Sequence, residues 1–194
     1  MLVSVFLSYL PYAFVTAFTP GPNNVLSLHS ISQRGWRQGK FVLMGISSGF
    51  FSVMVVCALF CWELARYVPT AAEVLKYLGA AYVVWLAVHI ARSGPEESEG
   101  GRASFLRCYL LQFINVKVIL YAITVYTGYV LPRGADLSAL LVHAVLLTVI
   151  GAAANLTWAT AGGVLRLFIN KHYRVFNLLM ALVLLFCAVS MVLD

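Results

Sequence analysis

The chain has 194 residues, of which 62% are hydrophobic and only 10% are charged. Soluble proteins average about 45–50% apolar and about 25% charged residues, so this composition excludes an ordinary water-soluble enzyme. It also excludes a disordered chain, and the scatter of the 13 basic residues excludes a nucleic-acid binder. A transmembrane helix takes about 20 apolar residues, so the chain is long enough for six spans and too short for an additional soluble domain.

Six apolar runs follow one another along the chain, each long enough for a transmembrane helix. They cover about residues 5–28, 41–62, 71–91, 105–131, 137–163 and 175–193. No basic residue precedes Arg34, so the first run lacks the charged segment of a secretory signal, and we expect it to be retained as a span. The pattern therefore predicts an all-α integral membrane protein with six transmembrane helices.

A polar segment rich in glycine and proline lies near the midpoint, at residues 93–104, and indicates a flexible cytoplasmic linker. It divides residues 1–92, with three spans, from residues 105–194, with three more. An odd number of spans gives the two halves opposite orientations, as in inverted-repeat transporters. We therefore predict a single transmembrane domain over residues 1–194, built as a 3+3 inverted repeat. Spans two and five each carry small residues four apart, from Gly45 and from Gly151, which lets helices approach closely.

The basic residues predict how the chain crosses the membrane. Nine of them lie in the first, third and fifth connections, and three lie in the segments on the opposite side. The nine are Arg34, Arg37, Lys40, Arg92, Arg102, Arg107, Arg166, Lys171 and Arg174. Cytoplasmic loops are enriched in lysine and arginine, so these connections are predicted to be cytoplasmic and both termini to lie outside.

Span one is interrupted by helix-breaking and polar residues, namely Thr19, Pro20, Gly21, Pro22, Asn23 and Asn24. A proline lacks an N–H and clashes with the preceding turn, so the carbonyls of Thr16 and Phe18 lose their helical partners. Asn23 or Asn24 then stands where it can cap a second half-helix. Freed carbonyls attract ammonium groups, and a helix N-terminus attracts anions, so the break suits an amino acid. The alternative is a structural kink filled by neighbouring helices.

Span four contains a second polar group, formed by Gln112, Asn115 and Lys117. A lysine within the bilayer is costly, so its side chain is expected to face the bundle interior or a cavity. Lys117 lies twelve residues into the span, which is about 18 Å along a helix and argues against snorkelling to the inner face. The carboxylates nearest the predicted spans, Glu63, Glu73 and Asp136, all fall near the outer boundary of the membrane. Lys117 is therefore predicted to bind freed carbonyls or a substrate carboxylate, and desolvation would let it cycle a proton.

The remaining polar residues give weaker signals. Asn155 lies near the middle of span five, where it either reaches the same cavity or bonds to a neighbouring helix. The four histidines have no visible partner and are interpreted as interface residues. The four cysteines show neither a zinc nor a disulfide pattern and are interpreted as buried free thiols. No metal and no cofactor is expected. The cysteines are Cys57, Cys61, Cys108 and Cys187.

Residues 19–24, followed by Gly-Trp-Arg-Gln-Gly at 35–39, resemble the signature of the LysE/RhtB family of bacterial amino-acid exporters. Residues 78–82 and 115–117 occupy the places of the third-span and fourth-span motifs of that family. Within the family, residues 79–87 and 112–121 are most similar to the cysteine/O-acetylserine exporters. The family usually reads Asn-Pro-Lys in span four, and Val116 replaces the proline here, which leaves open whether span four is broken.

The resemblance implies a multi-pass protein of the bacterial inner membrane, with periplasmic termini, that exports small neutral amino acids by alternating access and uses an ion (proton) gradient. It implies cysteine and O-acetylserine as substrates, with threonine, homoserine or leucine as alternatives, and leaves a homo-oligomer open. Some distant relatives are thiol–disulfide electron carriers, for which Cys108 is the nearest sulfur analogue here. A scaffold without cargo is a third alternative. The predicted substrate-binding residues are Thr19, Pro20, Gly21, Pro22, Asn23, Asn24, Gln112, Asn115, Lys117 and Asn155.

Overall fold

The computed structural model describes residues 2–19, 21–67 and 104–193, and isolated residues between 77 and 92. Every described element is helical. In chain order they are α1 (Leu2–Phe18), α2 (Pro22–Tyr67), α4 (Phe105–Leu111), the 3₁₀ turn η1 (Gln112–Ile114), α5 (Val116–Val125), the π-helical turn η2 (Tyr126–Val130), the 3₁₀ turn η3 (Leu131–Arg133), α6 (Leu137–Lys171) and α7 (Tyr173–Leu193). The span predicted at residues 71–91 and the linker predicted at 93–104 lie largely outside the described residues.

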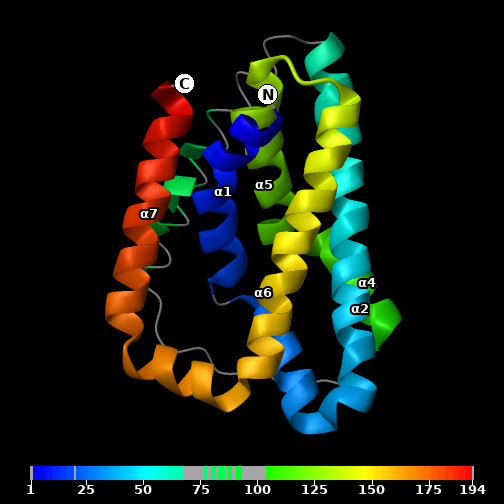
Figure 1. The fold of residues 1–194 in the computed structure, drawn as a ribbon, viewed down its shortest axis with the longest axis vertical. Coiled ribbons are helices and arrows are strands. Elements are labelled where there is room, and N and C mark those ends of the chain that lie inside the picture. Colours follow the sequence, from blue (N-terminus) through cyan, green and yellow to red (C-terminus); the bar gives the residue numbers. More distant parts are fainter. Residues whose placement is uncertain are drawn as a thin grey trace.

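The helices form an elongated bundle in which α1 packs among α5, α6 and α7. Figure 1 shows α1 between α7 on one side and α5 and α6 on the other, while α2 runs along α6 and α4. Both chain ends lie at one end of the bundle. The turn within α2 and the junction between α6 and α7 lie at the opposite end.

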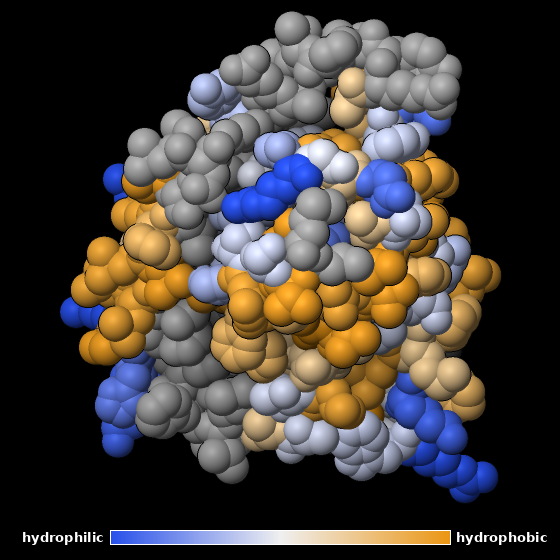
Figure 2. Space-filling model, turned by 45° about the horizontal axis from the view of Figure 1, so that its top comes forward, coloured by the Kyte–Doolittle hydropathy of each residue, from blue (hydrophilic) through white to orange (hydrophobic). Residues whose placement is uncertain are grey.

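The described helices are long and apolar enough for a membrane. Residues Gly35–Ala65 and Leu137–Ala161 each qualify as a span. Two bent pairs qualify when each is taken as one span, and they bend by 52° near residue 20 and by 58° near residue 115. The described residues therefore hold up to four spans, and the six-span repeat stays a prediction. Figure 2 shows apolar side chains as a broad band across one face of the molecule, which fits a surface that faces lipid.

The α2 turn replaces the loop expected between the first two spans. Gly35 has φ 66° and ψ 173°, and helix continues on both sides of it. Only glycine adopts this backbone conformation readily, because it has no Cβ. A Cβ on Gly39 would lie 2.5 Å from Cδ1 of Ile31 and 3.0 Å from the carbonyl oxygen of Ser30. The two glycines of the 35–39 motif therefore allow a tight turn and the close approach of its two arms.

The predicted close approach at small residues is confirmed for α2. A Cβ on Gly45 would lie 2.4 Å from the carbonyl oxygen of Phe105, and one on Gly49 would lie 2.5 Å from that of Tyr109. Both glycines thus let the backbone of α4 rest against α2. A Cβ on Gly151 would lie 3.3 Å from the ring of Phe50, so α6 also packs closely on α2.

Buried tyrosines fill the space between α1 and the α5–η2 segment. Tyr9, Tyr12, Tyr126 and Tyr129 are each at most 1% exposed. The hydroxyl of Tyr126 donates to the carbonyl of Met54 at 3.1 Å. The hydroxyl of Tyr9 is hydrogen-bonded to Nδ1 of His143 on α6 at 2.7 Å. The interpretation of His143 as an interface residue is therefore wrong, because its ring is buried in the bundle and has a partner on α1.

Asp136 marks the start of α6. Its carboxylate accepts hydrogen bonds from the Ala139 N–H at 2.9 Å and from the Ser138 hydroxyl at 2.8 Å. These bonds, the one from Ala139 foremost, hold the pKa of the Asp136 carboxyl below its usual value. The carboxylate therefore caps the helix at the end of the bundle rather than entering its interior.

The glycine contacts can be tested with Gly49→Ala. The added methyl group would meet the Tyr109 carbonyl, so we expect α2 and α4 to separate and the free energy of unfolding to fall by about 1–3 kcal/mol. Thermal unfolding of the purified protein in detergent measures the effect. Ser48→Ala, at an exposed position on the same helix, serves as the control and should leave the melting temperature unchanged. Equal melting temperatures for the two variants would contradict the close contact.

Candidate functional site

The predicted break in span one is present between α1 and α2. Helix α1 ends at Phe18, and the N–H of Val25 donates to the carbonyl of Gly21 at 3.0 Å as the first bond of α2. Pro22 thus occupies the first helical position, where its missing N–H has no cost. The prediction that Asn23 or Asn24 caps α2 is wrong, because Gly21 precedes the first helical residue. Pro20 lies outside the described residues.

The carbonyl groups at the end of α1 bind donors from two other parts of the chain. Nδ2 of Asn24 donates to the carbonyl oxygens of Ala17 and Thr19, at 2.9 Å each. Nε1 of Trp158 on α6 donates to the carbonyl of Phe18 at 3.1 Å. The Asn24 side chain therefore donates to carbonyl groups at the end of α1 and does not cap the start of α2, the helix to which it belongs. The freed carbonyl of Phe18 follows the sequence prediction, whereas its partner Trp158 was not predicted.

Span four is also broken, although it has no proline. Asn115 has φ −79° and ψ 95°, which is extended, between η1 and the first residue of α5. Its side chain makes no cap bond to α5 and instead donates to Oδ1 of Asn23 at 3.4 Å. Asn23 and Gln112 exchange two amide hydrogen bonds, of 2.8 and 3.0 Å. The two broken helices are thus joined by amide side chains.

Lys117 adds a charged contact between the two breaks. Its Nζ donates to the carbonyl oxygen of Thr19 at 3.1 Å. A Cβ on Gly21 would lie 2.9 Å from the same Nζ, so a glycine at that position leaves room for the ammonium group. Lys117 therefore does bind a freed carbonyl of the span-one break, which is one of the two partners predicted for it.

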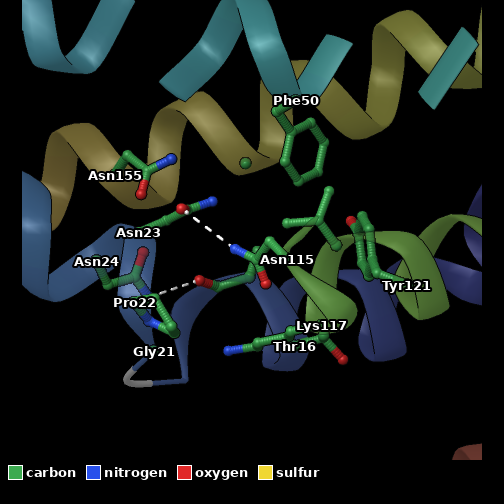
Figure 3. Close-up of a pocket in the computed structure, with 13 residues that line it drawn as sticks. Thr16, Gly21, Pro22, Asn23, Asn24, Phe50, Asn115, Lys117, Tyr121 and Asn155 are labelled. Atoms are coloured by element: carbon green, nitrogen blue, oxygen red, sulfur yellow. Dashed lines mark hydrogen bonds between the residues drawn. The ribbon is translucent and has the colours of Figure 1, made fainter. Parts of the chain in front are cut away.

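A pocket lies where the two breaks meet α6 and the second arm of α2. Its volume is about 420 Å³, including space open to solvent. Figure 3 shows Asn155 and Phe50 on one side, Asn23 and Asn115 facing each other, and Lys117 extending toward the break. The lining residues are Thr16, Ala17, Gly21, Pro22, Asn23, Asn24, Phe50, Asn115, Lys117, Val118, Tyr121, Gly151 and Asn155.

The structure gathers most of the predicted site residues in this pocket. Seven of them line it, namely Gly21, Pro22, Asn23, Asn24, Asn115, Lys117 and Asn155. Thr19 and Gln112 do not line it, but each is hydrogen-bonded to a lining residue. Oδ1 of Asn155 also accepts a hydrogen bond from the Ser27 hydroxyl at 3.4 Å, so Asn155 both reaches the cavity and joins two helices.

Sequence reasoning missed Thr16, Phe50 and Tyr121. Tyr121 follows Lys117 by four residues, so helical periodicity places both on one face of α5, and this signal was available. Thr16 precedes the break by one turn on α1. Phe50 comes from α2, and only the packing of α2 on α6 brings it to the pocket.

The described cysteine side chains lie away from the pocket. Cys57, Cys61 and Cys108 are buried and free, as predicted, and none of them lines the pocket. The side chain of Cys187 lies outside the described residues. A thiol–disulfide relay needs two cysteines that meet at the reacting site, and the described part of this site contains none.

The bond from Trp158 to the broken helix can be tested with Trp158→Phe. The variant keeps an aromatic ring but leaves the Phe18 carbonyl without this donor, so we expect a loss of about 1–3 kcal/mol in the free energy of unfolding. Trp36→Phe, at an exposed position after Gly35, is the matched control and should melt like the wild type. The assignment fails if both variants melt at the same temperature in detergent.

Comparison with known proteins places this chain in a family. A model described as "LysE type translocator" matches residues 14–194. The chain is 42% identical to the cysteine/O-acetylserine efflux protein of Escherichia coli K12, over 97% of this chain and 98% of the relative. The corresponding Shigella flexneri protein is 43% identical over 94% of each chain. No solved structure matches the chain. With nearly its whole length matched, this chain belongs to the LysE type translocator family.

Proposed function

We propose that the protein exports small neutral amino acids, with cysteine and O-acetylserine as substrates, by alternating access around the pocket between the two broken helices. The names of the relatives above support this substrate class. The observation that carries the proposal is the position of the Lys117 ammonium group, which lines this pocket and is bonded to the carbonyl of Thr19.

The charge of the pocket favours a neutral amino acid. Among the described lining residues, Lys117 contributes a positive charge and none contributes a carboxylate. The carboxylate of a substrate would bind the ammonium group of Lys117, and such charge-assisted bonds are roughly twice as strong as neutral ones. The substrate ammonium group would bind amide oxygens of the lining, such as Oδ1 of Asn155. A lysine or arginine substrate would bring a second cation that this lining does not neutralise.

The size of the pocket favours a small substrate. Its 420 Å³ of empty space includes space open to solvent, so the enclosed part of the pocket is smaller than that volume. Ala17, Gly21 and Gly151 contribute little side-chain volume to the walls. The aromatic rings of Phe50 and Tyr121, with centroids 5.9 Å apart, limit the pocket on the side away from the break.

Alternating access would use the two breaks as hinges. In the proposed topology each half of the 3+3 repeat contributes one broken helix, and the amide bonds of Asn23 with Gln112 and Asn115 join the halves. Both termini are proposed to be periplasmic in the bacterial inner membrane, which agrees with their position at the same end of the bundle. Proton coupling would use a titratable group such as the half-buried Lys117 or the buried His143. A homo-oligomer remains part of the proposal to be tested.

Counterflow in proteoliposomes tests the substrate class. Vesicles loaded with unlabelled cysteine or O-acetylserine should accumulate the labelled amino acid, and should accumulate lysine poorly because the pocket already holds a cation. Threonine, homoserine and leucine are measured in parallel. If one of these amino acids is exchanged faster than cysteine and O-acetylserine, it replaces them as the proposed substrate. A variant with all four cysteines changed to alanine should retain exchange, and its loss would support the thiol–disulfide alternative instead.

Lys117→Met tests the proposed role of the ammonium group. Methionine keeps most of the apolar stem and removes the charge, so we expect the initial rate of counterflow to fall about tenfold or more. Lys40→Met removes an exposed charge near the α2 turn and should leave the rate unchanged. Both variants are checked by size-exclusion chromatography. A fully active Lys117→Met protein would exclude a role for this charge in transport.

A further inference from the structure

Two residues that line the pocket have a buried hydroxyl group with no hydrogen-bond partner among the described residues. The two groups are Oγ1 of Thr16 on α1 and the phenolic oxygen of Tyr121 on α5. Both residues line the pocket, and each is only 2% exposed. Buried polar groups in proteins nearly always have a partner, and one without a partner is destabilising. Two such groups in one pocket indicate a ligand that supplies the partner.

Other threonines in helices of this protein show the bond that Thr16 lacks. The hydroxyls of Thr127, Thr148 and Thr157 each donate to the carbonyl four residues earlier in their helix, at 2.7–2.8 Å. Thr16 lies in a helix and makes no bond of this kind. The hydroxyl of Tyr126, one turn beyond Tyr121, donates to the carbonyl of Met54. Thr124 is a further buried threonine without a partner, but it does not line the pocket and plays no part here.

The two hydroxyls lie where the side chain of a bound amino acid would reach. Lys117 and Tyr121 are four residues apart on α5, which is about 6 Å along the helix axis. Thr16 lies on α1, beside Lys117 in Figure 3 and one turn after Tyr12, whose ring stacks on that of Tyr121 with centroids 5.8 Å apart. A substrate whose carboxylate binds Lys117 can therefore extend its side chain toward Tyr121 and Thr16. Phe50 offers only an apolar surface at this end.

We propose that the hydroxyls of Thr16 and Tyr121 recognise the side chain of the transported amino acid and select short side chains that can form hydrogen bonds. This inference rests on the proposed function. A hydroxyl both donates and accepts, so the pair suits the thiol of cysteine, the ester carbonyl of O-acetylserine and the hydroxyl of serine. A site that is built to bond a polar group discriminates against an analogue without that group, because its own buried partners are then left unpaired.

The test compares amino acids that differ only in this polar group. Counterflow of labelled O-acetylserine is measured with an unlabelled competitor, which is serine, cysteine or 2-aminobutyrate. Serine and cysteine are each compared with 2-aminobutyrate. The proteins are the wild type, Tyr121→Phe, Thr16→Val and the double variant. We expect the wild type to prefer the polar competitor. Each single variant should reduce that preference about five- to tenfold, chiefly by weakening binding of the polar competitor while 2-aminobutyrate competes as before.

Stability measurements separate recognition from a structural role. The Tyr121 hydroxyl has no partner in the empty pocket, so without ligand Tyr121→Phe should melt at the wild-type temperature or above it. O-acetylserine should then stabilise this variant less than it stabilises the wild type. Tyr126→Phe is the matched control, since its hydroxyl is bonded to Met54 and does not line the pocket. That control should melt lower and keep the wild-type preference for polar competitors.

The possible failures are distinguishable. A wild type that exchanges neither O-acetylserine nor cysteine overturns the proposed function and this inference with it. A wild type that transports both, with unchanged preference in Tyr121→Phe and Thr16→Val, overturns the inference and leaves the proposed function standing. A Tyr121→Phe protein that melts well below the wild type without ligand shows that the hydroxyl has a structural partner, and this also overturns the inference.

Discussion

The unpaired backbone at the end of α1 is the constraint around which the centre of this molecule is built. A helix that ends inside an apolar bundle leaves carbonyl groups that water cannot reach, and each needs a donor from the protein. Three side chains supply these donors: Asn24 from the next helix, Trp158 from α6 and Lys117 from α5. The break in one helix therefore fixes the positions of two others. Two of these donors, Asn24 and Lys117, line the pocket.

The second break depends on the first. Asn115 adopts an extended conformation without a proline beside it, and its amide group binds Asn23 at the start of α2. Asn23 in turn exchanges two hydrogen bonds with Gln112. Such polar bonds between the two broken helices are suited to a transporter, because a substrate that brings its own charged groups can replace some of them. The ammonium group of Lys117, now held by the Thr19 carbonyl, is the group that a substrate carboxylate would compete for.

Local sequence patterns predicted much of this arrangement. The prolines and glycine of residues 19–22 predicted the first break, since their effect on the backbone is covalent. The cost of a lysine in the bilayer predicted that Lys117 faces the interior. The same reasoning missed Thr16, Phe50 and Tyr121, whose importance depends on which helix lies opposite. It also misassigned Asn24, because an asparagine after a break can serve either helix, and only the path of α1 decides between them.

The sequence by itself therefore determined that the chain is helical and apolar, where the first helix breaks, and which cation lies among apolar residues. These properties follow from composition, from backbone geometry and from the cost of burying charge, all of which act locally. The tertiary structure decided that the helix before α5 breaks at Asn115 and that Trp158 binds the Phe18 carbonyl. It also decided that Thr16 and Tyr121, which line the pocket, have hydroxyl groups without a partner among the described residues. Such features depend on contacts between residues that are distant in the chain, and no local pattern encodes them.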